Sequence, residues 1–233
     1  MTSTPVVLIV GAPSRERDAC EALLHRLHLR LRVAEPYSRD LNAVHAGKAD
    51  VCVALCDNYL TAVHEVRLYR DLWQKLPLLV LDATPGARLT VPLLDAGADD
   101  VLRPHQAMTQ LGARVRALLR RTTMDSAVQG KVSLVAGNLK IDPSTHRVWI
   151  GSNEVPFSPT EFLILQKLCL HSGRVVPHRE IFIAVWGEFR PEMAERLRVY
   201  IRHIRRKMQT AAETVSITTR PGIGYMLSVG TGA

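Results

Sequence analysis

Short apolar runs alternate with stretches of helical spacing through the first 121 residues. The runs predict five buried strands, at Val6–Val10, Leu31–Ala34, Val51–Cys56, Leu78–Leu81 and Asp100–Leu102. The helical stretches predict five helices, at Ser14–His28, Ser38–His45, Ala62–Trp73, Leu89–Ala96 and Thr109–Arg121. Pro92 weakens the fourth of these helices. Strands that alternate with helices predict βαβ units, and therefore a parallel sheet covered by helices on both faces.

The pattern changes after Thr122–Lys131, a polar stretch without periodicity that we expect to be a linker. Short strand candidates punctuated by turn residues follow, at Ser133–Val135, Leu139–Asp142, Arg147–Ile150 and Glu154–Pro156. Ser158 and Glu161 then form a capping box that opens a helix. The remaining elements are helices at Ser158–His171, Ile181–Trp186 and Pro191–Gln209, and a hairpin of Val215–Thr219 with Gly224–Val229. Three helices followed by a hairpin predict a winged helix-turn-helix domain.

The helix predicted at Pro191–Gln209 is strongly amphipathic. Its apolar stripe consists of Leu197, Ile201, Ile204 and Met208. The rest of its circumference is basic and holds Arg196, Arg198, Arg202, Arg205, Arg206 and Lys207. No acidic residue lies between Arg196 and Gln209, so this face cannot neutralise itself through pairs four residues apart. Such a helix suits the major groove of DNA, although a solvated charged face has the same pattern.

Composition supports a polyanionic partner and gives no sign of a catalytic site. The 233 residues suffice for two domains, and the net charge of +8 divides into +2 for residues 1–125 and +6 for residues 126–233. The four cysteines form no metal-ligand spacing, and we find no nucleophile–base set and no phosphate-binding loop. We therefore expect no enzyme activity, no metal and no cofactor. Because no apolar run is long enough for a membrane span and no signal peptide is recognisable, we expect a soluble, cytoplasmic protein without membrane contact.

Four segments of the second half resemble the winged-helix output domain of OmpR/PhoB-type response regulators: SPTEFLILQKL, GRVVPHREIFIAVWG, LRVYIRHIRRKM and ITTRPGIGYML. The resemblance implies DNA contacts at Trp186, Arg198, Val199, Tyr200, Arg202, His203, Arg205, Arg206, Thr219, Arg220 and Tyr225. Tyr200 lies close to the apolar stripe on the helical wheel, so a core position is its alternative. In the wing, Pro221 stands where the family has Arg, and Arg220 comes one residue early. The resemblance also places RNA polymerase contacts in the loop Glu188–Glu192.

The first half resembles the receiver domain of the same family through Val6–Val10, Gly97–Asp100 and Ala113–Arg121. An active receiver uses an acid pair for Mg²⁺, an Asp that accepts phosphate, a Ser/Thr and a Lys. This chain has other residues at these places: Gly11 and Ala12 for the acids, Leu55 for the phosphoacceptor, Asp82 for the Ser/Thr, and Pro104 or Arg103 for the Lys. Asp57 is the substitute phosphoacceptor that we consider. Asp100 and Arg114 preserve one ion pair of the family's dimer interface.

The sequence thus predicts an α/β protein with a receiver-like, flavodoxin-like parallel-sheet domain at residues 1–121. A linker at 122–131 and a winged helix-turn-helix domain at 132–233 follow. The expected function is sequence-specific transcriptional regulation, as an atypical response regulator that acts independently of aspartate phosphorylation. The expected partners are double-stranded DNA, RNA polymerase and a second copy of the chain, bound through the receiver domains. The alternative is a sensor whose receiver-like domain responds to an unknown small molecule or partner protein.

Overall fold

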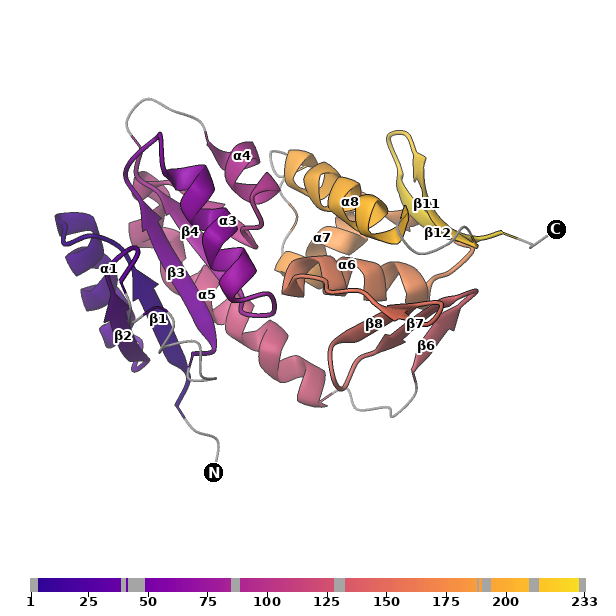
Figure 1. Ribbon diagram of the computed structural model, residues 1–233, viewed down its shortest axis with the longest axis horizontal. Helices are drawn as coiled ribbons and strands as arrows, with labels where there is room; N and C mark the ends of the chain where they lie inside the picture. Colours follow the sequence, from indigo (N-terminus) through magenta and orange to yellow (C-terminus); the bar gives the residue numbers. More distant parts are fainter. Residues whose placement is uncertain are drawn as a thin grey trace. The chain divides into compact units, whose positions relative to one another are not determined.

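The computed structural model describes residues 4–38, 41, 49–84, 89–127, 133–187, 189, 194–209 and 214–230 (Figure 1). The chain divides into two compact units, Met1–Thr122 and Thr123–Ala233. The described part of the first unit has one sheet and that of the second has two, and each unit has its own hydrophobic core. The resemblance places polymerase contacts in the loop 188–192, which lies outside the described residues apart from Phe189. Most of the helix expected at 38–45 also lies outside the described residues.

The first unit contains a five-stranded parallel sheet, which confirms the predicted fold class. Its strands are β1 (Val6–Val10), β2 (Arg30–Ala34), β3 (Val51–Cys56), β4 (Leu78–Asp82) and β5 (Asp100–Leu102). Their spatial order is β2-β1-β3-β4-β5, and every neighbouring pair is parallel. Its helices are α1 (Arg15–Arg26), α3 (Ala62–Leu72), α4 (Thr90–Asp95) and α5 (Pro104–Ala127). This strand order belongs to the flavodoxin-like class of doubly wound sheets, whose functional sites lie at the carboxyl ends of the strands.

Helix lengths in this unit depart from the predictions in two places. Pro92 shortens α4 to Thr90–Asp95, and it is tolerated because it occupies the first turn, where its missing N–H has no intrahelical partner. By contrast, α5 begins five residues before the predicted start, with Pro104 at its first position. It also continues to Ala127, so the first six residues expected in the linker are helical. Residues 122–127 contain no Gly or Pro that would end a helix, and polarity alone did not reveal this continuation.

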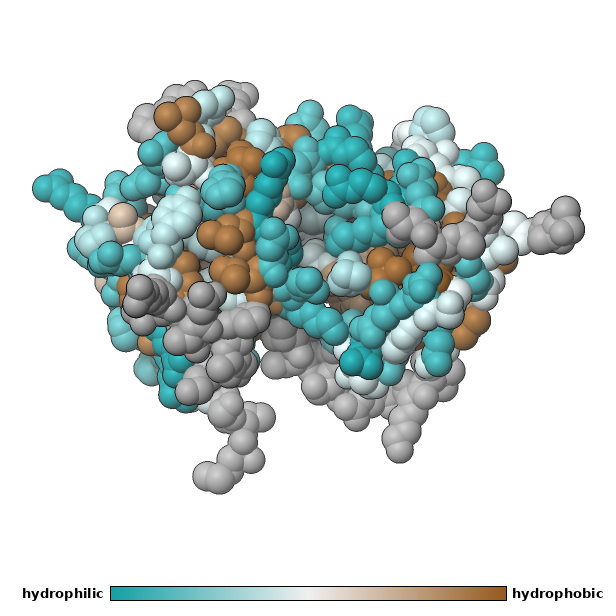
Figure 2. All heavy atoms as spheres, in the orientation of Figure 1, coloured by the Kyte–Doolittle hydropathy of each residue, from teal (hydrophilic) through white to brown (hydrophobic). Residues whose placement is uncertain are grey.

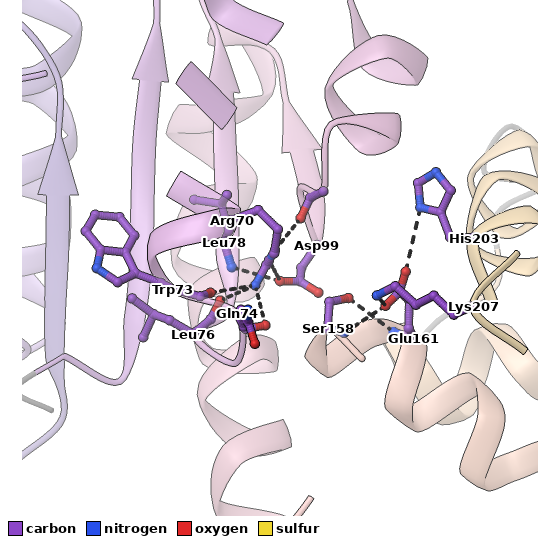
Figure 3. Close-up of polar contacts among 11 residues, drawn as sticks. Arg70, Trp73, Gln74, Leu76, Leu78, Asp99, Ser158, Glu161, His203 and Lys207 are labelled. Atoms are coloured by element: carbon purple, nitrogen blue, oxygen red, sulfur yellow. Dashed lines mark hydrogen bonds and ion pairs between the residues drawn. The ribbon is translucent and has the colours of Figure 1, made fainter. Parts of the chain in front are cut away.

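Arg70 joins α3 to two loops at one side of the sheet (Figure 3). Its guanidinium donates to the carbonyl oxygens of Gly97, Trp73, Gln74 and Leu76 at 2.9 to 3.0 Å. It also pairs with the fully buried Asp99, whose Oδ2 lies 2.6 Å from Nη2 and accepts from the Leu78 N–H at 2.9 Å. The pair therefore fixes the loop before β5 against the start of β4.

The second unit has the predicted winged-helix architecture. A four-stranded antiparallel sheet comes first, with β6 (Leu134–Ala136), β7 (Leu139–Asp142), β8 (Arg147–Ile150) and β9 (Asn153–Glu154). Three helices follow, α6 (Pro159–Leu170), α7 (His178–Trp186) and α8 (Ala194–Gln209). The wing is a three-stranded sheet in the order β10-β12-β11, made by β10 (Val176–Pro177), β11 (Val215–Arg220) and β12 (Gly224–Val229).

The short strand β10 was not predicted, since two residues carry no periodic signal. It exists because Val176 and Pro177 pair with Tyr225 and Gly224 of β12. A side chain at Gly224 would overlap the carbonyl group of Val176, so only glycine permits this close approach of the two strands. The wing is thereby attached to the residue that immediately precedes α7.

Candidate nucleic-acid interface

The helix α8 buries the side of its surface that the sequence predicts. Leu197, Ile201, Ile204 and Met208 have exposed fractions between 0 and 6%. Burying these four side chains stabilises the helix by about 2 kcal/mol each, as an upper estimate. The predicted apolar stripe is therefore confirmed.

Three arginines of α8 form a row on the opposite side. Arg198, Arg202 and Arg206 are exposed, and their spacing of four residues places them on one face of the helix. Hydrophilic side chains cover this helix in the space-filling view (Figure 2). We call this set the arginine row. Three adjacent cations on one face of a helix can neutralise phosphates of a nucleic-acid backbone.

Five residues implied in DNA contact are instead buried: Trp186, Val199, Tyr200, His203 and Tyr225, with exposed fractions of 2 to 6%. These five side chains belong to the core of this unit, and their contact with DNA stays a prediction. The buried side of α8 is wider than the predicted stripe, because neighbouring elements cover residues on its border. Tyr200 packs against Trp186 with ring centroids 5.8 Å apart, and therefore holds the core position that the helical wheel gave as its alternative.

His203 lies beside a buried acid instead of facing outward (Figure 3). Its Nδ1 is 3.7 Å from Oε1 of Glu161, and Lys207 contacts the other oxygen of the same carboxylate. Glu161 also completes the predicted capping box, since the Ser158 N–H donates to Oε2 at 2.8 Å and Ser158 Oγ accepts from the Glu161 N–H. One carboxylate thus caps α6 and attaches it to α8, a role that the local motif alone did not reveal.

Arg205 connects α8 to the wing. Its Nε and one Nη donate to the Ile217 carbonyl oxygen at 2.9 and 2.8 Å, and the Nη also donates to Thr219 Oγ1 at 2.7 Å. The guanidinium carbon lies 6.0 Å from the ring centroid of Tyr225. These contacts use Nε and one Nη of the guanidinium, so the structure gives Arg205 a positioning role between helix and wing.

The tip of the wing is open. Thr219 and Arg220 are exposed, and the Ile223 N–H donates to the Arg220 carbonyl oxygen at 3.0 Å to close the turn through Pro221 and Gly222. Gly222 has a φ of +73°, which explains glycine at this position. Arg220 therefore lies at the end of β11, next to the turn, with its side chain in solvent.

His178 is a residue of this surface that the sequence did not single out. It is the first residue of α7, its N–H donates to the Ile223 carbonyl oxygen at 3.0 Å, and its ring meets the Tyr225 ring edge-on at 5.3 Å. Partial burial lowers the pKa of His178, and the nearby Arg198 lowers it further. The sequence predicts that this helix starts three residues later, at Ile181, and it shows neither the wing contact nor the neighbouring cation.

At the carboxyl edge of the parallel sheet, the side chain of Leu55 lies close to Gly11. A Cβ added to Gly11 would come within 3.0 Å of the Leu55 Cβ, closer than such contacts normally are. Leu55 itself is 7% exposed. An acid at position 11 would therefore displace the side chain that stands at the predicted phosphoacceptor position.

The other residues of this edge are Asp57, Asp82 and Pro104. Asp57 and Pro104 are exposed. Asp82 is buried, and its Oδ1 accepts from the N–H and hydroxyl of Thr84 at 3.3 and 2.5 Å. Its Oδ2 has no hydrogen-bond partner among the residues that the structure describes. The part of the chain that the structure describes contains no group of three side chains suited to a metal ion. The described cysteines Cys20, Cys52, Cys56 and Cys169 are buried free thiols, as the sequence favours.

Asp100 and Arg114, the pair expected at a dimer interface, contact each other within one chain. The Arg114 Nη1 lies 3.4 Å from Asp100 Oδ2, and both side chains are less than 10% exposed. The Gln110 side chain accepts a second hydrogen bond from Arg114 at 3.2 Å. Within the chain, the pair holds α5 against β5.

Comparisons with known proteins give the family. Residues 152–227 match the family described as "Transcriptional regulatory protein, C terminal". Response regulator MprA of Mycolicibacterium vanbaalenii is 37% identical over 168 residues, which are 72% of this chain and 73% of the relative. The protein of the same name from Mycobacterium leprae is 38% identical over 168 residues, with the same coverage. A solved structure of a RitR mutant covers 97% of this chain and 100% of its own with a TM-score of 0.75 at 22% identity, which shows a shared fold.

A parallel-sheet unit followed by a winged-helix unit with an exposed arginine row defines a two-domain DNA-binding regulator. The chain belongs to the OmpR/PhoB-type response regulators, and its second unit is a DNA-binding domain for transcriptional regulation. None of the helices in the described ranges is both long and apolar enough to cross a membrane.

Proposed function

We propose that the protein binds specific DNA sites through the arginine row of α8 and the tip of the wing. The observation that carries this proposal is the row itself, since Arg198, Arg202 and Arg206 project from a helix whose opposite side is fixed in the core. Thr219 and Arg220 would reach the backbone or the adjacent minor groove. Arg205 would hold the two surfaces in register through its contacts with β11.

Selection of bound sequences from random duplex DNA tests the specificity. We expect an enriched motif made of two direct repeats, and binding that weakens steeply as salt is raised. Recovery of no motif, with binding to all duplexes equal, would contradict sequence-specific recognition.

We further propose that aspartate phosphorylation does not control this regulator. Gly11 and Ala12 carry no carboxylate for Mg²⁺, and Leu55 at the expected phosphoacceptor position cannot accept a phosphoryl group. Asp57 is exposed and follows β3, but it has no partner acid at Gly11 or Ala12. The buried Asp82 stands where an active receiver would have the hydroxyl that contacts the phosphoryl group.

Incubation with acetyl phosphate and Mg²⁺ tests this second proposal, with intact mass as the readout. We expect no added phosphoryl group and no change in DNA affinity. The matched control is Asp57→Asn. A phosphorylated species in the unaltered protein that disappears in the control would identify Asp57 as the acceptor and refute the proposal.

The proposed assembly is a homodimer formed through the receiver-like units, which would present two winged helices to a direct repeat. The Asp100–Arg114 pair supports it indirectly, because it orders the β5–α5 surface. Sedimentation of the protein over a range of concentrations tests the assembly, and a monomer at all concentrations would argue against it. RNA polymerase is the proposed partner at the promoter, supported by the family alone, and co-purification on promoter DNA tests it.

A further inference from the structure

A cavity of about 190 Å³ opens at the carboxyl edge of the parallel sheet, and the DNA-binding proposal makes no use of it. Three elements form its walls: the first half of α1, the end of β4 and the first turn of α5. The lining residues are Arg15, Glu16, Ala19, Cys20, Leu81, Pro104 and Ala107. Pro104 is one of the residues that replace the lysine of an active receiver, so the cavity lies where this chain departs from its family.

The inner surface of the cavity is apolar. Ala19, Leu81 and Ala107 contribute only hydrocarbon, and Cys20 is 2% exposed. Burial raises the pKa of the Cys20 thiol to about 11, with Glu16 and Glu21 adding to the effect, so the thiol is protonated and uncharged at neutral pH. The volume exceeds that of an engineered apolar cavity of about 150 Å³ that accepts benzene, so a compact hydrocarbon group fits.

The mouth of the cavity carries one cation and one anion. Arg15 and Glu16 are exposed, and neither side chain makes a hydrogen bond or ion pair within the described part of the chain. Adjacent residues point about 100° apart on a helix, so the two charges flank the opening without pairing with each other. The first turns of α1 and α5 also line the cavity, and helix N-termini favour a carboxylate.

We infer that this cavity binds a small α-amino acid with an apolar side chain. The ligand's carboxylate pairs with Arg15 and the N-terminus of α1, its ammonium pairs with Glu16, and its hydrocarbon group lies against Ala19, Leu81 and Ala107. The inference rests on the proposed absence of phosphate control. The bound amino acid would supply the signal at the edge of the sheet where phosphorylation acts in an active receiver. The site contacts both charged groups of the ligand and its hydrocarbon side chain. A simple fatty acid or amine offers only one of the two charges.

Calorimetric titration of the full-length protein with leucine tests the inference. Leucine is compared with 4-methylpentanoate, which lacks the ammonium group, and with 3-methylbutylamine, which lacks the carboxylate. We expect saturable leucine binding, and at least about tenfold weaker binding of each half-charged analogue, since each loses a charge-assisted contact. Valine, isoleucine and methionine complete the panel of apolar side chains, and aspartate serves as the polar comparison.

Three variants locate the site. Arg15→Gln and Glu16→Gln change exposed residues, so both should fold, and each should weaken leucine binding at least about tenfold. Ala107→Phe fills the cavity and should abolish binding. Arg26→Gln removes a charge from the last turn of the same helix, away from the cavity, and should bind leucine like the unaltered protein.

Absence of saturable heat with any apolar amino acid at millimolar concentration would overturn the inference. Equal binding of leucine and 4-methylpentanoate would overturn the amino-acid class, and unchanged binding in Arg15→Gln would exclude this cavity. The titration contains no DNA, so its failure is separable from failure of the proposed regulator function. Acetyl phosphate sensitivity and DNA affinity are measured independently of it.

Discussion

Replacing Arg202 by Gln should weaken DNA binding without unfolding the protein. Arg202 is the middle residue of the arginine row and its side chain is exposed, so glutamine loses the charge without opening the core. Both residues are good helix formers, and an exposed substitution of this kind changes stability by only about 0.5 kcal/mol or less. The thermal midpoint of the variant should therefore match that of the unaltered protein.

The size of the effect follows from the number of phosphate contacts that α8 can make. Each phosphate neutralised on B-DNA contributes about 0.9 to the slope of log affinity against log salt. The row offers three cations, so it accounts for a slope of up to about −2.7. Loss of one contact should reduce the slope by about 0.9, which corresponds to about fivefold weaker binding at roughly 0.15 M salt. If Arg202 also contacts a base, the variant should lose about 1–3 kcal/mol of discrimination between the correct and an incorrect base at one position of the DNA site.

Fluorescence anisotropy with the selected DNA site, at salt concentrations from about 50 to 200 mM, measures both quantities. The matched control is Arg26→Gln, which removes the same charge from an exposed position of α1 in the other unit. A slope and affinity equal to those of the control, with an unchanged thermal midpoint, would show that α8 does not present the arginine row to DNA.

Three further sets of variants test the contacts around this surface and in the first unit. Arg70→Met should lower the free energy of unfolding by about 3–5 kcal/mol in denaturant melts, because it leaves the buried Asp99 carboxylate without its cation. If this is the cause, the double variant Arg70→Met/Asp99→Asn should lose less unfolding free energy than Arg70→Met alone. Proton NMR should place the pKa of His178 below 6.5, and Arg198→Gln should raise it part of the way back, since burial remains. Because the unfolded chain binds that proton more readily, His178 should make the protein less stable as pH falls below about 6.5, and His178→Gln should reduce this loss. Arg205→Met should weaken DNA binding and speed amide exchange in β11, because the Ile217 carbonyl oxygen loses both of its donors; unchanged exchange would contradict the positioning role.

Local patterns predicted most of the elements, and pairing between distant residues decided the rest. The capping box of Ser158 and Glu161 fixed the start of α6, because its partners are three residues apart. The strand β10 escaped prediction because its partner Tyr225 is 49 residues away in the chain. Likewise, the role of Arg70 depends on Asp99 and on the loop at Gly97, which the sheet brings beside α3. No local pattern announces such contacts.

The sequence by itself determined the two folds and the apolar side of α8, and it predicts the loss of the receiver's phosphate chemistry at Leu55. Periodicity is sufficient for the first two, since it fixes the type and order of the elements and the buried side of each. Only the tertiary structure decided which residues of α8 face solvent. Burial depends on neighbours from other elements, and Trp186 and Glu161 hold Tyr200 and His203 inside whereas Arg198, Arg202 and Arg206 stay outside.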